Sequence, residues 1–285
     1  MSIIVIIVTF NSAWVIERCL NSLEKQPEQH SVIIVDNHST DATVEVIKNK
    51  FKRVTLIENE QNLGYAGGNN LGITEALKRN CDYICILNPD TQLLANTFTR
   101  VTRFAQAHKN QGIFGPIIYK DEHRQIIWST GGTLDKKRYT AQLTDFNKQS
   151  ITLENIREND FISGTCLVIP EGLLRQGLRF YEPYFMYYED VEFSLRAKKM
   201  GYPAMVVEEA GLTHTETSQL AAHKNYYIAR NHLLFVERNA PIRVQLHEMI
   251  RLPKTIWEHF KRRDAQSLLG IKDYVRHRFG RKYGS

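Results

Sequence analysis

Four short apolar runs, each ending in a polar turn before a helix-like segment, constrain the fold of this chain most. The runs cover residues 3–8, 31–35, 54–58 and 83–87. The first is rich in β-branched side chains and apolar on both faces, which is typical of a central parallel strand. After it, apolar residues recur at helical spacing: Val15, Ile16, Cys19, Leu20 and Leu23. Repeated strand–helix units predict an α/β fold, with a mostly parallel sheet, right-handed crossovers and helices on both faces.

The alternation becomes less regular after the fourth repeat. Further strands are predicted at 113–119, 161–169 and 204–207, and a helix at about 189–200, while residues 121–160 are a long polar excursion with short strands. Beyond Pro241 the pattern is helical. We therefore predict a sheet domain over residues 1–240 and a basic amphipathic helical tail over residues 241–285.

The positive charge of the chain is concentrated in its tail. The formal net charge is +6, but the residues from Arg251 onward alone hold ten Lys/Arg and three Asp/Glu. The sheet domain is therefore nearly neutral, which argues against nucleic-acid binding. No apolar run approaches the ~20 residues of a membrane span, so we expect a cytoplasmic protein with reduced thiols. Cys81 and Cys85 lack the second pair that a zinc site needs.

Polar side chains follow three of the predicted strands. They are Thr9 and Asn11, Asp36 and Asn37, and Asn88 and Asp90. The carboxyl ends of parallel strands meet at one edge of a sheet, where ligands bind. Such groups can hydrogen-bond a base and ribose, and a carboxylate can hold a divalent cation. Singly these are ordinary turn residues, but the three sets together favour a nucleotide site. Neither a GxGxxG fingerprint nor a GxxxxGK[ST] loop is present.

Three other segments could carry chemistry. Residues 64–70 hold three glycines, which allow close approach of a ligand at the start of a helix. Residues 185–192 place acidic groups beside aromatic ones, either as partners of a helix dipole or as a general base with a raised pKa. His214 follows a predicted strand, so it is either a metal or phosphate ligand or a structural residue.

Five motifs occur in an order that resembles family 2 glycosyltransferases of the GT-A fold. They are VTFN at 8–11, VDNHSTD at 35–41, NLGYAGGN at 62–69, LNPD at 87–90 and YED at 188–190. The pattern is most similar to the bacterial rhamnosyltransferase-like branch and covers about residues 3–238. It implies a Rossmann-like, mostly parallel sheet flanked by helices, with the tail as a C-terminal helical extension. It also implies inverting, metal-dependent transfer from a nucleoside-diphosphate sugar, dTDP-rhamnose or a UDP-sugar.

The resemblance also implies roles for individual residues. Asp190 would be the general base, and Asp90 the principal ligand of Mn²⁺ or Mg²⁺. His214 is a candidate further ligand from its position after a predicted strand, not from the resemblance. Asn88 stands where the family's DxD motif has its first Asp, a departure that could weaken metal binding. The implied donor-binding residues are Thr9, Asn11, Asp36, Asn37, Gly67, Asn70, Asn88 and, for the diphosphate, Arg230. The implied acceptor is a glycan or lipid-linked glycan of a cell-surface polysaccharide or lipopolysaccharide.

Basic residues mixed with Trp257, Phe260 and Phe279 in the tail suit an anionic membrane surface, reached through residues 251–285. This interpretation places the enzyme at the inner face of the cytoplasmic membrane. Alternatively, the tail helices pack on the sheet domain or form a dimer.

Two alternatives to a glycosyltransferase remain. A nucleotidyltransferase of similar fold predicts a glycine-rich, basic loop after the first strand, which residues 9–12 do not provide. A non-catalytic scaffold has no need of both Asp90 and Asp190.

Overall fold

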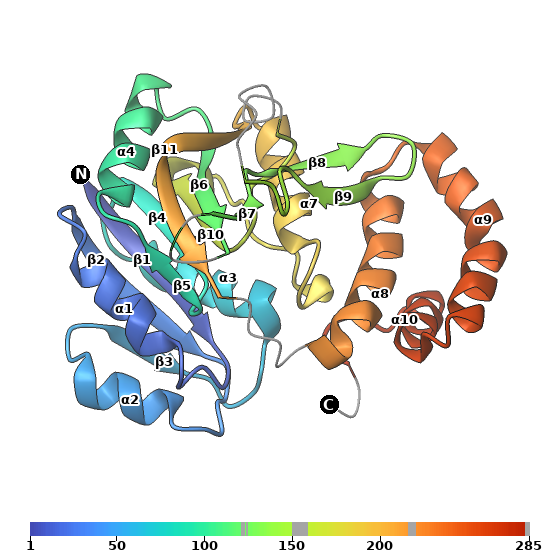
Figure 1. Ribbon diagram of the computed structural model, residues 1–285, viewed down its shortest axis with the longest axis horizontal. Coiled ribbons are helices and arrows are strands. Elements are labelled where there is room, and N and C mark those ends of the chain that lie inside the picture. Colours follow the sequence, from blue (N-terminus) through green and yellow to red (C-terminus); the bar gives the residue numbers. More distant parts are fainter. Residues whose placement is uncertain (121–122, 124, 150–158, 216–220, 283–285) are drawn as a thin grey trace.

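A central sheet organises the chain. In the computed structural model, which describes residues 1–120, 123, 125–149, 159–215 and 221–282, nine strands form this sheet. Helices lie on both faces, and three more gather at one end of the molecule (Figure 1). In spatial order the strands are β3 (Thr55–Glu58), β2 (Gln29–Asp36), β1 (Ser2–Thr9), β4 (Tyr83–Leu87), β10 (Cys166–Pro170), β6 (Ile113–Tyr119), β11 (Ala204–His214) and β5 (Thr91–Leu93), with β7 (Ile127–Ser129) beside β6. A separate hairpin joins β8 (Gly132–Asp135) to β9 (Thr140–Leu143).

The first half of the sheet has the predicted parallel arrangement. β1 pairs in parallel with both β2 and β4, and β2 pairs in parallel with β3. Beyond β4 the sheet is mixed, because β10 runs antiparallel to β4 and β6, and β5 runs antiparallel to β11. The carboxyl ends of β1, β2 and β4 therefore lie at one edge.

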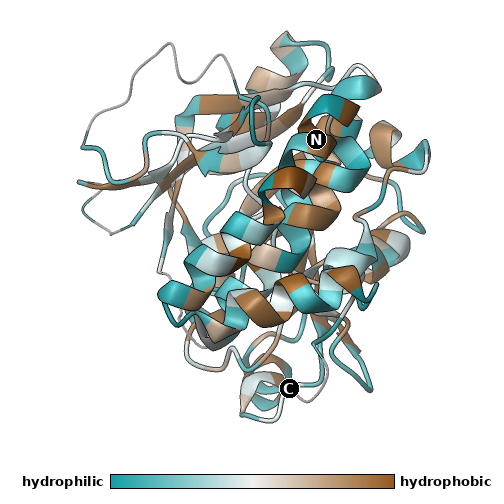
Figure 2. Cartoon of the chain, turned by 90° about the vertical axis from the view of Figure 1, so that its right-hand side faces the viewer, coloured by the Kyte–Doolittle hydropathy of each residue, from teal (hydrophilic) through white to brown (hydrophobic). Residues whose placement is uncertain are grey.

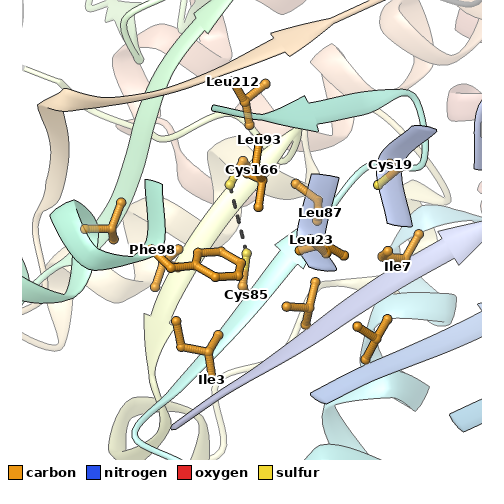
Figure 3. Packing of buried hydrophobic residues seen from close by; sticks show 14 of the residues in the cluster. Ile3, Ile7, Cys19, Leu23, Cys85, Leu87, Leu93, Phe98, Cys166 and Leu212 are labelled. Carbon is orange, nitrogen blue, oxygen red and sulfur yellow. Dashed lines mark hydrogen bonds between the residues drawn. The ribbon is translucent and has the colours of Figure 1, made fainter. Parts of the chain in front are cut away.

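Alternate residues of β1 face two hydrophobic cores. Ile3, Val5 and Ile7 pack with α1 (Ile16–Glu24), α2 (Thr43–Lys50) and α4 (Thr97–Ala107), whereas Ile4 and Ile6 pack with α3 (Gly64–Ala76), α6 (Glu171–Arg175) and α7 (Glu189–Lys199). Burial on both faces explains why the strand is apolar throughout. Figure 3 shows the first core, where the sulfurs of Cys85 and Cys166 lie 3.9 Å apart.

The cysteine spacing does not form a metal site. Cys85 belongs to the first core and Cys81 packs against the second, so their side chains lie on opposite faces of the sheet. All four thiols are free.

Two segments differ from their predicted bounds. The strand predicted at 161–169 is limited to Cys166–Pro170, and the one predicted at 204–207 continues to His214 through a register shift after Val207. Residues 64–70 are the first turns of α3. An ideal Cβ at Gly68 would lie 2.8 Å from Val8, and one at Gly72 would lie 2.4 Å from Ile6. These glycines therefore serve close packing of the helix on β1.

The tail contains α9 (Ile242–Lys261) and α10 (Ala265–Val275), which follow α8 (Ala221–Asn239). α10 packs against α8, where an ideal Cβ at Gly270 would lie 2.3 Å from the carbonyl oxygen of Tyr226. Phe279 packs beside Tyr274. This part of the tail thus adopts the packed alternative. Within the described residues, no helix combines the length and hydropathy of a membrane span.

Gly270→Ala is expected to lower the free energy of unfolding by about 1–3 kcal/mol, because the added methyl group would meet a backbone atom of α8. The matched control is Gly172→Ala in α6, where nothing lies within 4 Å of the added Cβ. That change should be neutral or stabilise the protein by about 0.5–1 kcal/mol. Urea unfolding measures both, and equal midpoints would contradict the packing argument.

Candidate functional site

A cleft of about 450 Å³ lies at the edge of the sheet where β1, β2 and β4 end. Five of the residues singled out in the sequence line it: Asn37, Asn88, Asp90, Asp190 and His214. They come from four separate stretches of the chain. The parallel strands therefore deliver these groups to one edge, as expected for an open α/β sheet.

The ends of β1 and β2 are tied to each other beside this cleft. The Thr9 hydroxyl donates to Asp36 Oδ1 at 2.8 Å, and the Ser39 N–H donates to Asp36 Oδ2 at 2.8 Å. Asn11 Oδ1 accepts from the Thr40 N–H at 2.8 Å. Thr9 and Asp36 are buried. The side chains of Thr9, Asn11 and Asp36 thus brace two turns. Asn37 lines the cleft, but its side chain is buried, and it donates to the Gly64 carbonyl and accepts from Asn59 Nδ2, each at 2.9 Å.

Asp90 and His214 form a pair at one wall of the cleft. Antiparallel pairing of β5 with β11 places His214 opposite Thr91, so its Nε2 lies 3.2 Å from Asp90 Oδ1. The ring of Trp128 meets the imidazole edge-on, with centroids 4.8 Å apart. His214 Nδ1 is buried and makes no hydrogen bond to any described residue.

This pair has the donor types that a divalent cation needs. Carboxylate oxygens suit Mg²⁺ and Mn²⁺, and imidazole suits transition metals. Among the described residues, no cluster of three or more His, Cys, Asp and Glu side chains could hold a metal. A cation at Asp90 and His214 would therefore take its other ligands from a bound diphosphate and from water.

Two carboxylates at the start of α7 form another part of the cleft. Asp190 Oδ2 accepts from the Gly164 N–H at 2.9 Å, and its Oδ1 accepts from the Val191 N–H at 2.8 Å. Burial raises the pKa of Asp190 above its ordinary value, although these N–H groups oppose the shift. Burial, and then the charge of Asp190, raise the pKa of Glu189 well above its ordinary value. The lining residues Tyr65 and Tyr187 keep this wall partly apolar.

The segment before α7 has an unusual backbone. Phe185, Tyr187 and Tyr188 have φ values of 66°, 66° and 74°, a region that non-glycine residues adopt at a cost of about 1–3 kcal/mol each. The Asn231 Nδ2 of α8 lies within 2.9 Å of three carbonyl oxygens in this segment, those of Tyr184, Met186 and Tyr187. Helix α8 thus holds the left-handed backbone that presents Glu189 and Asp190.

Arg230, expected at the diphosphate, lies elsewhere. It is fully buried, and its guanidinium donates to the carbonyl oxygens of Tyr184 at 2.8 Å, Pro183 at 3.2 Å and Gly280 at 2.6 Å. These bonds hold the short 3₁₀ turn (Glu182–Tyr184) that leads to the left-handed residues. The guanidinium therefore bonds to backbone carbonyls of the protein and does not line the cleft.

Two further predicted donor-binding residues also lie outside the cleft lining. Gly67 is buried within α3, against Leu63. Asn70 donates to the carbonyl oxygen of Phe180 and accepts from its N–H, each at 2.9 Å. Because α3 starts at Gly64, Gly67 and Asn70 lie within the helix and contact other parts of the protein instead of the cleft.

Several cleft residues were not identified from the sequence. Lys224 in α8 is exposed and lines the cleft, so it is a cation available to a phosphate. Trp128 comes from β7, inside the polar excursion, where no local pattern marks it. Glu189 had a signal, because it precedes Asp190 in the YED motif.

Comparison with known sequences places this site in context. The chain matches the family model described as Glycosyl transferase family 2 over residues 4–173. It is 28% identical over 252 residues to the N-acetylglucosaminyl-diphospho-decaprenol L-rhamnosyltransferase of Mycobacterium tuberculosis, covering 79% of this chain and 82% of that relative. The dTDP-rhamnosyl transferase RfbF of Shigella flexneri is 25% identical over 266 residues, covering 87% of this chain and 85% of that relative.

Solved structures share the fold. A shortened TarS of S. aureus in complex with UDP aligns with a TM-score of 0.59 at 20% identity, covering 92% of this chain and 72% of that one. The mannosyltransferase PcManGT from Pyrobaculum calidifontis, in complex with GDP-Man and Mn²⁺, aligns with a TM-score of 0.61 at 16% identity. The alignment covers 96% of this chain and 74% of that one. The chain spans 44% of the longer TarS chain. The likeness confirms the predicted GT-A fold.

Asn231→Ala is expected to lower the free energy of unfolding by about 1–3 kcal/mol, because it leaves buried carbonyl oxygens without their donor. The matched control is Asn239→Ala on the same helix, whose amide donates to the Phe235 carbonyl. Urea unfolding of both variants measures the difference. If Asn231→Ala were no more destabilising than the control, α8 would not restrain the left-handed segment.

Proposed function

The chain belongs to glycosyl transferase family 2, and we propose that it transfers a sugar, with inversion, from a nucleoside-diphosphate donor to a hydroxyl of a cell-surface polysaccharide or lipopolysaccharide precursor. The observation that carries this proposal is the meeting of Asp90, His214 and Asp190 in one cleft. The first two suit the diphosphate end of a donor, and the third suits the acceptor hydroxyl. The family match and this pairing favour glycosyl transfer over nucleotidyl transfer or a non-catalytic scaffold.

The donor would lie along the sheet edge. The base and ribose would lie against the turns braced by Thr9, Asn11 and Asp36 and against Asn37, whose amide is held by Gly64 and Asn59, while Asn88 and Lys224 would meet the diphosphate. The relatives support two bases, because one is named a dTDP-rhamnosyl transferase and a solved neighbour holds UDP. A dTDP-sugar or a UDP-sugar is therefore the proposed donor.

A divalent cation, Mn²⁺ or Mg²⁺, fits the residues present. Asp90 supplies a carboxylate, and His214 Nε2 lies 3.2 Å from Asp90 Oδ1, so both atoms would hold one cation between them. When bound, such a cation stabilises the negative charge that develops on a diphosphate leaving group. The presence of an imidazole favours Mn²⁺ over Mg²⁺.

Asp190 would remove the proton from the acceptor hydroxyl. Its carboxylate is fixed by the N–H groups of Gly164 and Val191, so it is oriented before the acceptor arrives. The raised pKa makes it a stronger base than an exposed carboxylate, and general-base catalysis contributes about 10²–10⁴-fold. Attack opposite the leaving group, assisted by one base, inverts the anomeric carbon.

The acceptor proposal draws on the relatives. One is named for transfer to a diphospho-decaprenol-linked N-acetylglucosamine, a lipid-linked glycan. A lipid-linked acceptor is held at a membrane, so peripheral association with the inner face of the cytoplasmic membrane is part of the proposal.

Asp190→Asn is expected to lower kcat by about 10²–10⁴-fold, because the amide cannot take a proton. Nucleotide affinity should stay nearly unchanged, since the donor contacts lie elsewhere in the cleft. Transfer assays and calorimetric nucleotide titration measure the two effects. Equal losses of turnover and of affinity would refute the assignment, and Asp160→Asn serves as a control outside the cleft lining.

The rate of the unmodified enzyme should also fall as the pH falls through the raised pKa of Asp190, since the base acts deprotonated. The acidic limb of the kcat profile should therefore lie above 3.8, the ordinary value for an aspartate. An acidic limb at or below 3.8 would show that burial does not raise the pKa of the catalytic group.

Thermal unfolding with UDP, dTDP, GDP and ADP, each with and without Mn²⁺, tests the donor site. A ligand at about 100 times its Kd stabilises by ~2.7 kcal/mol, which raises Tm by a few degrees. We expect a Mn²⁺-dependent rise with UDP or dTDP that Asp90→Ala abolishes. Asp82→Ala, just before the other end of β4, should leave it intact. An equal rise in Asp90→Ala, or no rise with any nucleotide, would contradict the proposed site.

A further inference from the structure

Helix α9 presents a mixed side to the molecule, in which Val244 and Leu252 lie among polar groups, and an apolar side to solvent. On the inner side Val244 is buried, Glu248 Oε2 lies 3.9 Å from His232 Nε2, and His259 Nδ1 lies 3.3 Å from Asp264 Oδ2. A surface helix of a globular protein normally has the opposite orientation. Packing within this chain therefore does not explain why α9 exposes its apolar side.

The outer side of α9 is a continuous apolar stripe. Seven large apolar side chains, 40% to 80% exposed, recur along it at spacings of one, three, four and six residues: Ile242, Leu246, Met249, Ile250, Ile256, Trp257 and Phe260. The rings of Trp257 and Phe260 stack, with centroids 5.9 Å apart. Figure 2 looks onto this end of the molecule and shows hydrophobic residues on its outer helices. Single exposed apolar residues are ordinary, but a stripe along a helix marks an interaction surface.

A basic depression adjoins this stripe. It is lined by Lys136, Lys137 and Arg138 from the β8–β9 turn and by Arg243, His247 and Arg251 from α9, with Asp135 as the acidic member. Lys261 adds a further cation, with its Nζ 5.2 Å from the Trp257 ring centroid. The hairpin and the helix are far apart in the sequence, so the tertiary structure creates this positive surface.

We propose that the α9 stripe and the basic depression together form a docking surface for an anionic lipid bilayer. Helix α9 would lie in the headgroup region, with its stripe toward the acyl chains and the basic side chains on lipid phosphates. An apolar helix face flanked by lysine and arginine has this binding mode, and anionic lipids strengthen it. The inference rests on the proposed function in one respect, since a lipid-linked acceptor gives the enzyme a reason to be there.

A second copy of the chain is a poorer occupant. A two-fold interface places the same patch on both partners, so each would bring its own lysines and arginines to the contact. Like charges facing each other disfavour association. The patch is therefore complementary to an anionic surface rather than to itself.

Co-sedimentation of the full chain with vesicles tests the proposal. We expect binding to vesicles of phosphatidylcholine mixed with phosphatidylglycerol, weaker binding to phosphatidylcholine alone, and a decrease with salt. Ile250→Gln/Trp257→Gln should lower the partition coefficient by about tenfold. Trp14→Gln is the matched control, because Trp14 is 50% exposed and Trp257 is 55% exposed. Lys136→Gln/Lys137→Gln/Arg138→Gln should weaken binding and flatten the salt dependence.

Two outcomes would overturn the proposal: wild-type binding by the α9 variant, or no vesicle binding by the unmodified protein. In the second case, dimerisation that the α9 variant abolishes would assign the surface to a second copy of the chain. The proposed function is tested separately. Asp190→Asn should bind vesicles as the unmodified protein does while losing transfer. A docking failure would leave nucleotide binding intact, and a failed nucleotide test would leave vesicle binding intact.

Discussion

The candidate site depends on hydrogen bonds from α8 to the segment before α7. Three residues of that segment have left-handed backbone angles without being glycine, which is stable only when the surroundings supply the energy. Arg230 and Asn231 supply it by donating to carbonyl oxygens of residues 183, 184, 186 and 187. This backbone turns Glu189 and Asp190 into the cleft, so Asp190, the proposed base, is oriented from a helix more than 40 residues away.

Another part of the cleft is built by pairing of strands. β4 ends at Leu87 and the chain reverses into β5, which pairs with the last residues of β11. Asp90 therefore meets His214, although more than 120 residues separate them in the sequence. The register of β5 with β11 sets the distance between the two side chains. Side chains positioned by paired strands are held more precisely than side chains on loops.

The C-terminal helices have two physical roles. α8 and α10 pack closely through Gly270, and this contact supports the helix that holds the segment before α7. α9 is attached to the rest through Val244 and through polar groups such as Glu248, and it leaves seven large apolar side chains in solvent. The same unit thus stabilises the site on one side and offers an interaction surface on the other. The prediction of a membrane-binding tail over 251–285 remains a proposal, but the surface that supports it lies on α9 and the β8–β9 hairpin rather than on α10.

Local sequence patterns determined the strand–helix alternation, the buried strands β1, β2 and β4 and the polar groups at their ends, because burial on two faces demands continuous apolar runs and parallel strands share one edge. They also identified Asp90, Asp190 and His214, which the fold brings to one cleft. The tertiary structure alone decided which polar residues face that cleft. Arg230 and Asn70 are the same residue types whether they bind a ligand or a backbone carbonyl, and only their position in the packed chain distinguishes the two. Lys224 and Trp128 have no local signature, since they reach the site through packing of distant elements, and packing depends on the whole chain.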